Sequence, residues 1–310
     1  MAVDAVDARA KDDFNRARMR ESVGRLFSLL SREKNRLLSL SEVKALLRPA
    51  SEVYRGMRTV PIAKIVGSEG RYQDFNRYFL PRHGHLRGRW ESIDRAHHRQ
   101  IILPPVTLYE IGGVYFVRDG NHRVSVARLQ GVEFIDAEVI SLGSRIALSP
   151  NMSAEDLRQA VIDLEYQAFR DHTDFARLCP ETRLAFTATG RYDEIVRHIQ
   201  GHKYYLNLSK TEEIPFSEAL RSWHDNVYSP IALVVEEQRL LDSFPGRTTS
   251  DLYVWIVRHW DELKRKYGQG YPLRQAVADY RARFGRPVVN PLLRLWRKLR
   301  RREGKPRASA

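Results

Sequence analysis

One stretch of the sequence decides the fold: VYFVRDGNHRVSVAR, residues 114–128. The β-favouring run Val114–Val117 is followed by the turn-forming pair Asp119-Gly120. The residues after this pair, from Arg123 to Arg128, have the pattern of the start of a helix. The stretch therefore predicts a strand, a tight turn and a helix.

This junction is a candidate anion site. The first turn of a helix has N–H groups without intrahelical partners, and the helix dipole adds partial positive charge there. Gly120 allows close approach to the backbone, Asn121 and His122 supply donors, and Arg123 offers a planar fork for phosphate oxygens. Asp119 either caps the helix or holds a divalent cation. The alternative is an ordinary capped turn with Arg123 as a surface charge.

A second glycine-containing loop precedes this junction. Residues Val60–Val66 alternate enough to predict a short strand, and Gly67-Ser68-Glu69-Gly70-Arg71 then ends it. This loop, with two glycines and Arg71, is a second candidate for contacting a ligand's phosphates, and Ser68 and Glu69 are its polar partners. Such loops are also common on protein surfaces without any function. A short amphipathic helix is expected next, over residues 74–79.

Composition describes a globular protein with an uneven charge. The chain has 310 residues, 43% hydrophobic and 29% charged, with a formal net charge of +14 and one cysteine. No stretch has the apolar length of a membrane span, and the acidic N-terminus lacks a secretory pattern, so a cytoplasmic location is expected. A lone Cys179 excludes an internal disulfide and a cysteine-built metal site, and predicts a small buried side chain. Most of the basic excess follows Arg281.

The flanking regions are predicted to be helical. Apolar residues recur at helical spacing between about Asp12 and Arg48, and the region after Leu142 contains several more such patterns. His198 and His202 are four residues apart, as in metal-binding helices, but Gly201 between them is expected to break the alignment. From Asn290-Pro291 onward, a basic amphipathic helix is expected.

From Ser92 to Ile140 the predicted order is helix, strand, hairpin, strand, Asp-Gly turn, helix and strand. This order resembles the ParB/sulfiredoxin-like superfamily, whose members share a phosphate-binding turn that opens a helix. Gly120-Asn121-His122-Arg123 is similar to that turn position by position. The longer segment Val60–Ile140 resembles a bacterial family of unknown function labelled "ParB-like nuclease" or "transcriptional regulator". The resemblance implies a small mixed sheet and phosphate binding.

The superfamily includes proteins with different activities, and comparing their turn motifs with residues 119–123 indicates which activity this chain resembles. Sulfiredoxins need a cysteine in the turn, where this chain has His122. Partitioning proteins of the ParB type bind CTP through a glycine–glutamate–arginine–arginine turn followed by a helix-turn-helix, which the downstream sequence does not show. Free-serine kinases of the superfamily carry an aspartate–glycine–x–histidine–arginine turn, and residues 119–123 are similar to it throughout. No carboxylate cluster for a two-metal nuclease is visible.

The resemblance implies a site for a nucleoside phosphate (ATP, ADP or CTP) with Mg²⁺. The phosphates would lie on the N–H groups of residues 120–123, with Arg123 on their oxygens. Asp119 or Glu69 would hold Mg²⁺ or accept a proton, and His122 would donate to the transferring group. The activities implied are phosphotransfer or nucleotide hydrolysis, and a turn that binds phosphate without catalysis is the alternative.

The sequence thus predicts an α+β protein in four parts. These are a helical arm (1–55), a ParB/sulfiredoxin-like domain with a mixed sheet (56–144), a mainly helical region (145–285) and a basic amphipathic tail (286–310). The expected function is binding of a nucleotide or phosphate. A DNA-associated regulator with a nucleotide switch is the rival function, and in it the tail supplies non-specific DNA affinity. The tail could equally contact lipid or pack on the body. The sequence does not indicate an oligomeric state.

Overall fold

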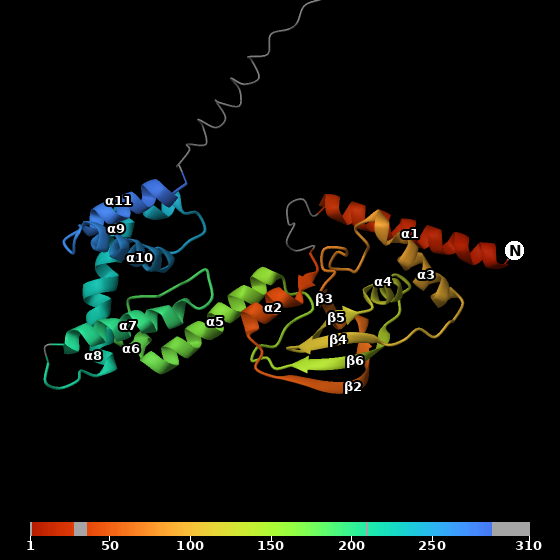
Figure 1. The fold of residues 1–310 in the computed structure, drawn as a ribbon, viewed down its shortest axis with the longest axis horizontal. Coiled ribbons are helices and arrows are strands. Elements are labelled where there is room, and N and C mark those ends of the chain that lie inside the picture. Colours follow the sequence, from red (N-terminus) through yellow and green to blue (C-terminus); the bar gives the residue numbers. More distant parts are fainter. Residues whose placement is uncertain (1, 28–35, 209, 287–310) are drawn as a thin grey trace, which may run out of the picture. The chain divides into compact units, whose positions relative to one another are not determined.

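The computed structural model describes residues 2–27, 36–208 and 210–286. The chain divides into two compact units, residues 1–161 and 162–310, with the boundary inside helix α5. The fold is α+β, with an N-terminal helix, a six-stranded mixed sheet and a mainly helical C-terminal half (Figure 1). The predicted α+β class, with an N-terminal helix, a mixed sheet and a mainly helical C-terminal region, is confirmed. The tail expected over residues 286–310 lies outside the described residues from residue 287 onward.

Unit 1 holds the sheet. Its elements in chain order are α1 (Ala2–Phe27), β1 (Leu38–Ser39), α2 (Leu40–Leu47), β2 (Glu52–Pro61), β3 (Ile65–Ser68), α3 (Arg87–His98), β4 (Val106–Ile111), β5 (Val114–Asp119), α4 (Asn121–Leu129) and β6 (Phe134–Leu142). The strand order is β1-β3-β5-β4-β6-β2. The pairs β4/β5 and β2/β6 are antiparallel, whereas β1/β3, β3/β5 and β4/β6 are parallel.

Successive side chains of β5 pack alternately into two separate hydrophobic clusters. Val117 packs in a cluster with Val124 and Ala127 of α4, while Phe116 packs in another with Leu40 of α2. This is the two-residue period of a strand buried on both faces. Beyond α4, a third cluster joins α1, α3 and α4 through Phe14, Ala17, Trp90, Ile93 and Val126. Helix α4 is therefore held between the sheet and a second layer of helices.

The edge strand β2 is long and exposed. Its side chains Val53, Tyr54 and Met57 are solvent-exposed, and the register with β6 shifts between Tyr54 and Gly56. The arginines Arg55 and Arg58 are exposed beside them. Among the described residues, β2 pairs with β6 alone.

Two local predictions in unit 1 are wrong. The strand predicted over Val60–Val66 is split, because Pro61 ends β2 and residues 62–64 form a 3₁₀ turn before β3. The helix predicted over residues 74–79 is a turn. There the Asn76 side chain accepts the N–H groups of Tyr78 and Leu80 at 2.9 and 3.0 Å, which competes with helix formation.

Unit 2 is built of helices. They are α5 (Ala154–Thr173), α6 (Phe175–Leu178), α7 (Arg191–Asn207), α8 (Phe216–Trp223), α9 (Ser229–Glu237), α10 (Thr249–Tyr267) and α11 (Leu273–Phe284). One core surrounds the fully buried Trp223 and Tyr253. Cys179 is free and buried, as predicted. The expected break at Gly201 is wrong, since α7 continues through it to Asn207.

Candidate functional site

The turn between β5 and α4 has the geometry that its sequence predicts. Strand β5 ends at Asp119, Gly120 takes φ 103° and ψ 23°, and α4 begins at Asn121. A Cβ at position 120 would lie 2.5 Å from Cγ1 of Val106, so a side chain there meets both a steric and a conformational penalty. The predicted strand, turn and helix are confirmed.

This turn borders a cleft of about 840 Å³. Its walls come from the end of β5, the start of α4, helix α3 and the loop after β3, all within unit 1. The lining residues are Gly70, Arg71, Asp74, His85, Leu86, Arg89, Ile93, Arg118, Asp119, Gly120, Asn121, His122 and Arg123. Basic side chains outnumber acidic ones on these walls, so the cleft favours an anion.

The helix start supplies main-chain donors to the cleft. The first α-helical hydrogen bond of α4 runs from the N–H of Val124 to the carbonyl of Gly120, at 3.0 Å. The preceding N–H groups, of residues 121–123, therefore have no acceptor within the helix. Together with the helix dipole they form a site that stabilises negative charge.

Asn121, the first residue of α4, has a buried polar atom without a partner among the described residues. The residue is 6% exposed, and its Oδ1 has no hydrogen bond to any described residue. Leaving a buried polar atom unpaired costs about 1–3 kcal/mol. Rotation of the amide exchanges its oxygen and nitrogen, so Asn121 can serve a ligand either as acceptor or as donor.

His122 carries a second unpartnered atom, Nδ1, which is buried without a hydrogen bond to the described residues. Burial is the main cause that lowers the pKa of His122 from 6.5 to about 4, and the charges of the nearby Arg71 and Arg89 contribute to the same shift. The imidazole is therefore neutral at pH 7, with one nitrogen able to donate and the other to accept a hydrogen bond. The effect of the arginines also shows that the cleft is electropositive.

The arginines of the cleft differ in how far they are engaged. Arg71 pairs with Asp74 at 3.1 Å, and the guanidinium of Arg118 lies 5.7 Å from the ring centroid of Tyr109. Arg89 is exposed on α3 and forms no hydrogen bond or ion pair with other described residues. Arg89 and Arg118 are consequently the cations most available to a ligand.

Arg123 is more constrained than the sequence suggested. Its guanidinium donates to the carbonyls of Pro104 and Pro105, to the latter at 2.8 Å, and it also pairs with the carboxylate of Asp119. These hydrogen bonds connect the start of α4 to the residues Pro104 and Pro105 that precede β4. The Asp119 side chain is 73% exposed, so a ligand phosphate can compete with it for Arg123.

The loop after β3 contributes only some of its predicted residues. Gly70 and Arg71 line the cleft, whereas Ser68 and Glu69 do not. Ser68 is fully buried at the end of β3, where its hydroxyl donates to the carbonyl of Val117 at 3.2 Å and accepts the N–H of Arg71. Glu69 is exposed. Ser68 therefore fastens the loop that positions Arg71.

Sequence reasoning about single motifs missed the α3 wall of the cleft. Arg89 and Ile93 reach it from α3, and His85 from the turn before that helix. The signal available was the density of arginine and histidine between Arg82 and Arg99. Nothing local in that segment indicated which of these side chains face α4.

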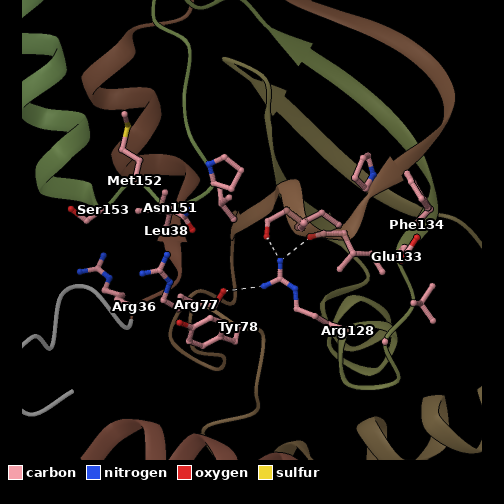
Figure 2. A pocket seen from close by; sticks show the side chains of 18 residues that line it. Arg36, Leu38, Arg77, Tyr78, Arg128, Glu133, Phe134, Asn151, Met152 and Ser153 are labelled. Atoms are coloured by element: carbon pink, nitrogen blue, oxygen red, sulfur yellow. Dashed lines mark hydrogen bonds between the residues drawn. The ribbon is translucent and has the colours of Figure 1, made fainter. Parts of the chain in front are cut away.

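A second cavity, of about 700 Å³, is lined by residues of the β2–β3 connection, the carboxyl end of α4 and the segment that follows it, and has mainly apolar walls. Arg128 projects into it and donates to the carbonyls of Ile62, Ile65 and Arg77 at 2.8, 3.0 and 3.1 Å (Figure 2). Burial lowers the pKa of Arg128. These bonds fasten α4 to the β2–β3 connection, which is a structural role.

Comparison with protein-family models, curated proteins and solved structures gives no match to this chain. Within the described ranges, no helix is both long enough and apolar enough to cross a bilayer.

Proposed function

We propose that the cleft at the start of α4 binds a nucleoside phosphate, in the manner that the resemblance to the ParB/sulfiredoxin-like superfamily implies. The observation that carries the proposal is the meeting of three features in one cleft. These are the unpaired N–H groups of residues 121–123, the unpartnered polar atoms of Asn121 and His122, and the cations Arg89 and Arg118. The N–H groups and the cations favour phosphate oxygens, and the amide of Asn121 and the imidazole of His122 can add a donor to them.

The size and polarity of the cleft favour a nucleotide over a bare phosphate ion. Its volume of about 840 Å³ is within the range of cofactor sites, and Leu86 and Ile93 offer apolar contact on the α3 side. Phosphates would lie on the α4 start, with Arg123 exchanging its Asp119 partner for a phosphate oxygen. The ligand classes are ATP, ADP and CTP.

Phosphotransfer or hydrolysis of that nucleotide is the proposed reaction class. Asp119 and Asp74 are the carboxylates in the cleft that can share Mg²⁺ with the phosphates. His122 is neutral and within the same walls, so it can donate to or accept from a reacting group. The rival DNA-associated function depends on the basic tail over residues 286–310, which from residue 287 onward lies outside the described residues.

The test is calorimetric titration of the full chain with ATP, ADP and CTP, each with and without Mg²⁺. We expect saturable binding of at least one nucleotide, weakened about fivefold or more by Arg89→Ala and by Arg118→Ala. Arg99→Ala is the matched control, because Arg99 follows α3 and lies 3.8 Å from Asp7 instead of in the cleft. Absence of saturable binding, or equal loss in the control, would overturn the proposal.

A further inference from the structure

A buried group of metal-ligand side chains lies in unit 1 away from the cleft. Asp13 comes from α1, and Asp94 and His98 lie one turn apart on α3. The two aspartates are 4% and 0% exposed, and the side chain of His98 is 10% exposed. Buried carboxylates need hydrogen bonds or cations to offset the loss of water.

The geometry points to a site for one divalent transition-metal cation of the Zn²⁺ type, bound by Asp13, Asp94 and His98. Nε2 of His98 lies 3.0 Å from Oδ2 of Asp13 and 3.2 Å from Oδ2 of Asp94. One ligand atom from each residue lies within 4.8 Å of the other two. Ligand atoms on a tetrahedral ion are about 3.3–3.6 Å apart for bonds of about 2.0–2.2 Å, so small side-chain shifts suffice.

One buried carboxylate oxygen of this group has no hydrogen bond to a described residue. Oδ2 of Asp94 is buried and has no hydrogen bond among the described residues, although the imidazole of His98 is close to it. The imidazole instead bonds to Asp13. A cation placed between these three atoms would engage that oxygen and neutralise the two carboxylates together.

A neighbouring amide already holds the proposed ligands in place. Gln130 follows α4, and its Nε2 donates to Oδ2 of Asp13 at 3.0 Å and to Oδ1 of Asp94 at 2.8 Å. Such outer hydrogen bonds to ligating carboxylates are usual at metal sites and fix the ligand orientation. None of them needs to break when an ion binds Oδ2 of Asp94.

The donor set selects the class of ion. One imidazole nitrogen with two carboxylate oxygens suits Zn²⁺, Co²⁺ or Mn²⁺, whereas Ca²⁺ and Mg²⁺ prefer oxygen-only sets. Among Mn²⁺, Co²⁺ and Zn²⁺, the usual affinity order disfavours Mn²⁺. The ion would link α1 to α3 and, through Gln130, to the carboxyl end of α4. The cleft borders the other end of that helix, so this site stands independently of the proposed function.

The experiment is zinc titration of the EDTA-treated full chain by calorimetry, with Co²⁺ absorption as a second readout of nitrogen and oxygen ligation. We expect one tight equivalent and a zinc-dependent rise in melting temperature. Asp94→Asn and His98→Ala should remove both, and Gln130→Ala should weaken zinc binding about tenfold or more. His97→Ala is the matched control, because His97 is the exposed neighbour of His98 on the same helix.

Each outcome bears on the inference. Retention of the tight equivalent in His97→Ala together with its loss in Asp94→Asn supports the site. Wild-type protein without a tight equivalent overturns it, leaving a hydrogen-bonded network that needs no ion. Undiminished binding in folded His98→Ala overturns it too, and assigns the zinc to surface histidines such as His83 and His85, whose rings stack at 5.5 Å. Far-UV circular dichroism establishes that each variant is folded.

Discussion

The imidazole of His122 stands edge-on to the buried ring of Phe75, with 5.4 Å between the ring centroids. The apolar ring removes water from one side of the imidazole, and burial is the largest cause of its low pKa. The neutral state of His122 therefore results mainly from its packing against Phe75 and other buried groups, and only secondarily from the charges of Arg71 and Arg89.

A pH dependence of stability follows from this pKa. The folded-state value is about 4 against 6.5 for the unfolded chain, so the unfolded state binds the proton more readily between these values. The contribution of His122 is complete above pH 6.5 and is lost as the pH falls through about 4. We expect His122→Leu to flatten the pH dependence of urea unfolding between pH 7 and 4.

The same pKa is directly measurable by NMR titration of the imidazole protons. A midpoint near 4 is expected in the free protein, and a higher midpoint when tripolyphosphate is bound, because the anion offsets the charges of Arg71 and Arg89. A midpoint near 6.5 in the free protein would contradict the burial of this side chain.

Gly120→Ala should destabilise unit 1 by about 2–4 kcal/mol, because the new Cβ adds a clash with Val106 to the cost of a positive φ. Gly131→Ala is the control. Gly131 also has a positive φ, of 75°, but no atom lies within 4 Å of the added Cβ, so a cost of about 1 kcal/mol is expected. Equal losses in urea unfolding would show that Val106 does not restrict the turn.

Arg123→Ala is expected to lower the free energy of unfolding by about 1–2 kcal/mol as well as weaken nucleotide binding. The reason is that its guanidinium also holds the carbonyls of Pro104 and Pro105. Asp119→Ala should cost less than about 0.5 kcal/mol, since that carboxylate is largely exposed. Denaturant titration of both variants checks the difference, and an unchanged stability of Arg123→Ala would contradict it.

Ser125→Ala should cost about 1–3 kcal/mol despite the small change in volume. Its buried hydroxyl accepts from Nε1 of Trp90 at 2.8 Å and donates to the carbonyl of Phe79 at 2.6 Å. Without it, both partners remain buried and unpaired. Thermal unfolding of this variant beside Ser92→Ala, an exposed site on α3, measures the effect.

In unit 2, Thr248→Ala should cost about 1 kcal/mol. Thr248 and Asp251 form a reciprocal capping box at the start of α10, and the Thr248 hydroxyl accepts the N–H of Asp251 at 3.1 Å. Thr249→Ala, one residue further into the helix, should change little. The free energy of unfolding in urea distinguishes the two variants.

Much of the sheet and the turn was predictable because their signals are local. The run Val114–Val117 and the pair Asp119-Gly120 each specify their own conformation. The failures arise where another part of the chain overrides a local pattern. Asn76 caps a turn in place of a helix, and α7 tolerates Gly201 because its apolar face is buried in unit 2.

The part of the candidate site that was predictable from the sequence is the β5–α4 turn together with Arg71 of the loop after β3. Gly120, Asn121, His122 and Arg71 were identified from sequence and do line the cleft. Arg89 reaches the cleft through the packing of α3 against α4, which no spacing in the sequence encodes, and Arg118 at the end of β5 was not singled out from the sequence. Ser68 was wrongly included among the residues that contact the ligand. Its burial at the end of β3 depends on the pairing of β3 with β5, which the local sequence does not reveal.

Strand β2 sets a limit on how this protein can associate. A long outer strand with free backbone groups is a template for intermolecular sheet growth. The irregular register at Tyr54/Gly56 disrupts that template, and the exposed charges of Arg55 and Arg58 repel the same edge of another molecule. We therefore expect replacement of these arginines with threonine to favour association of molecules through the edges of their β2 strands.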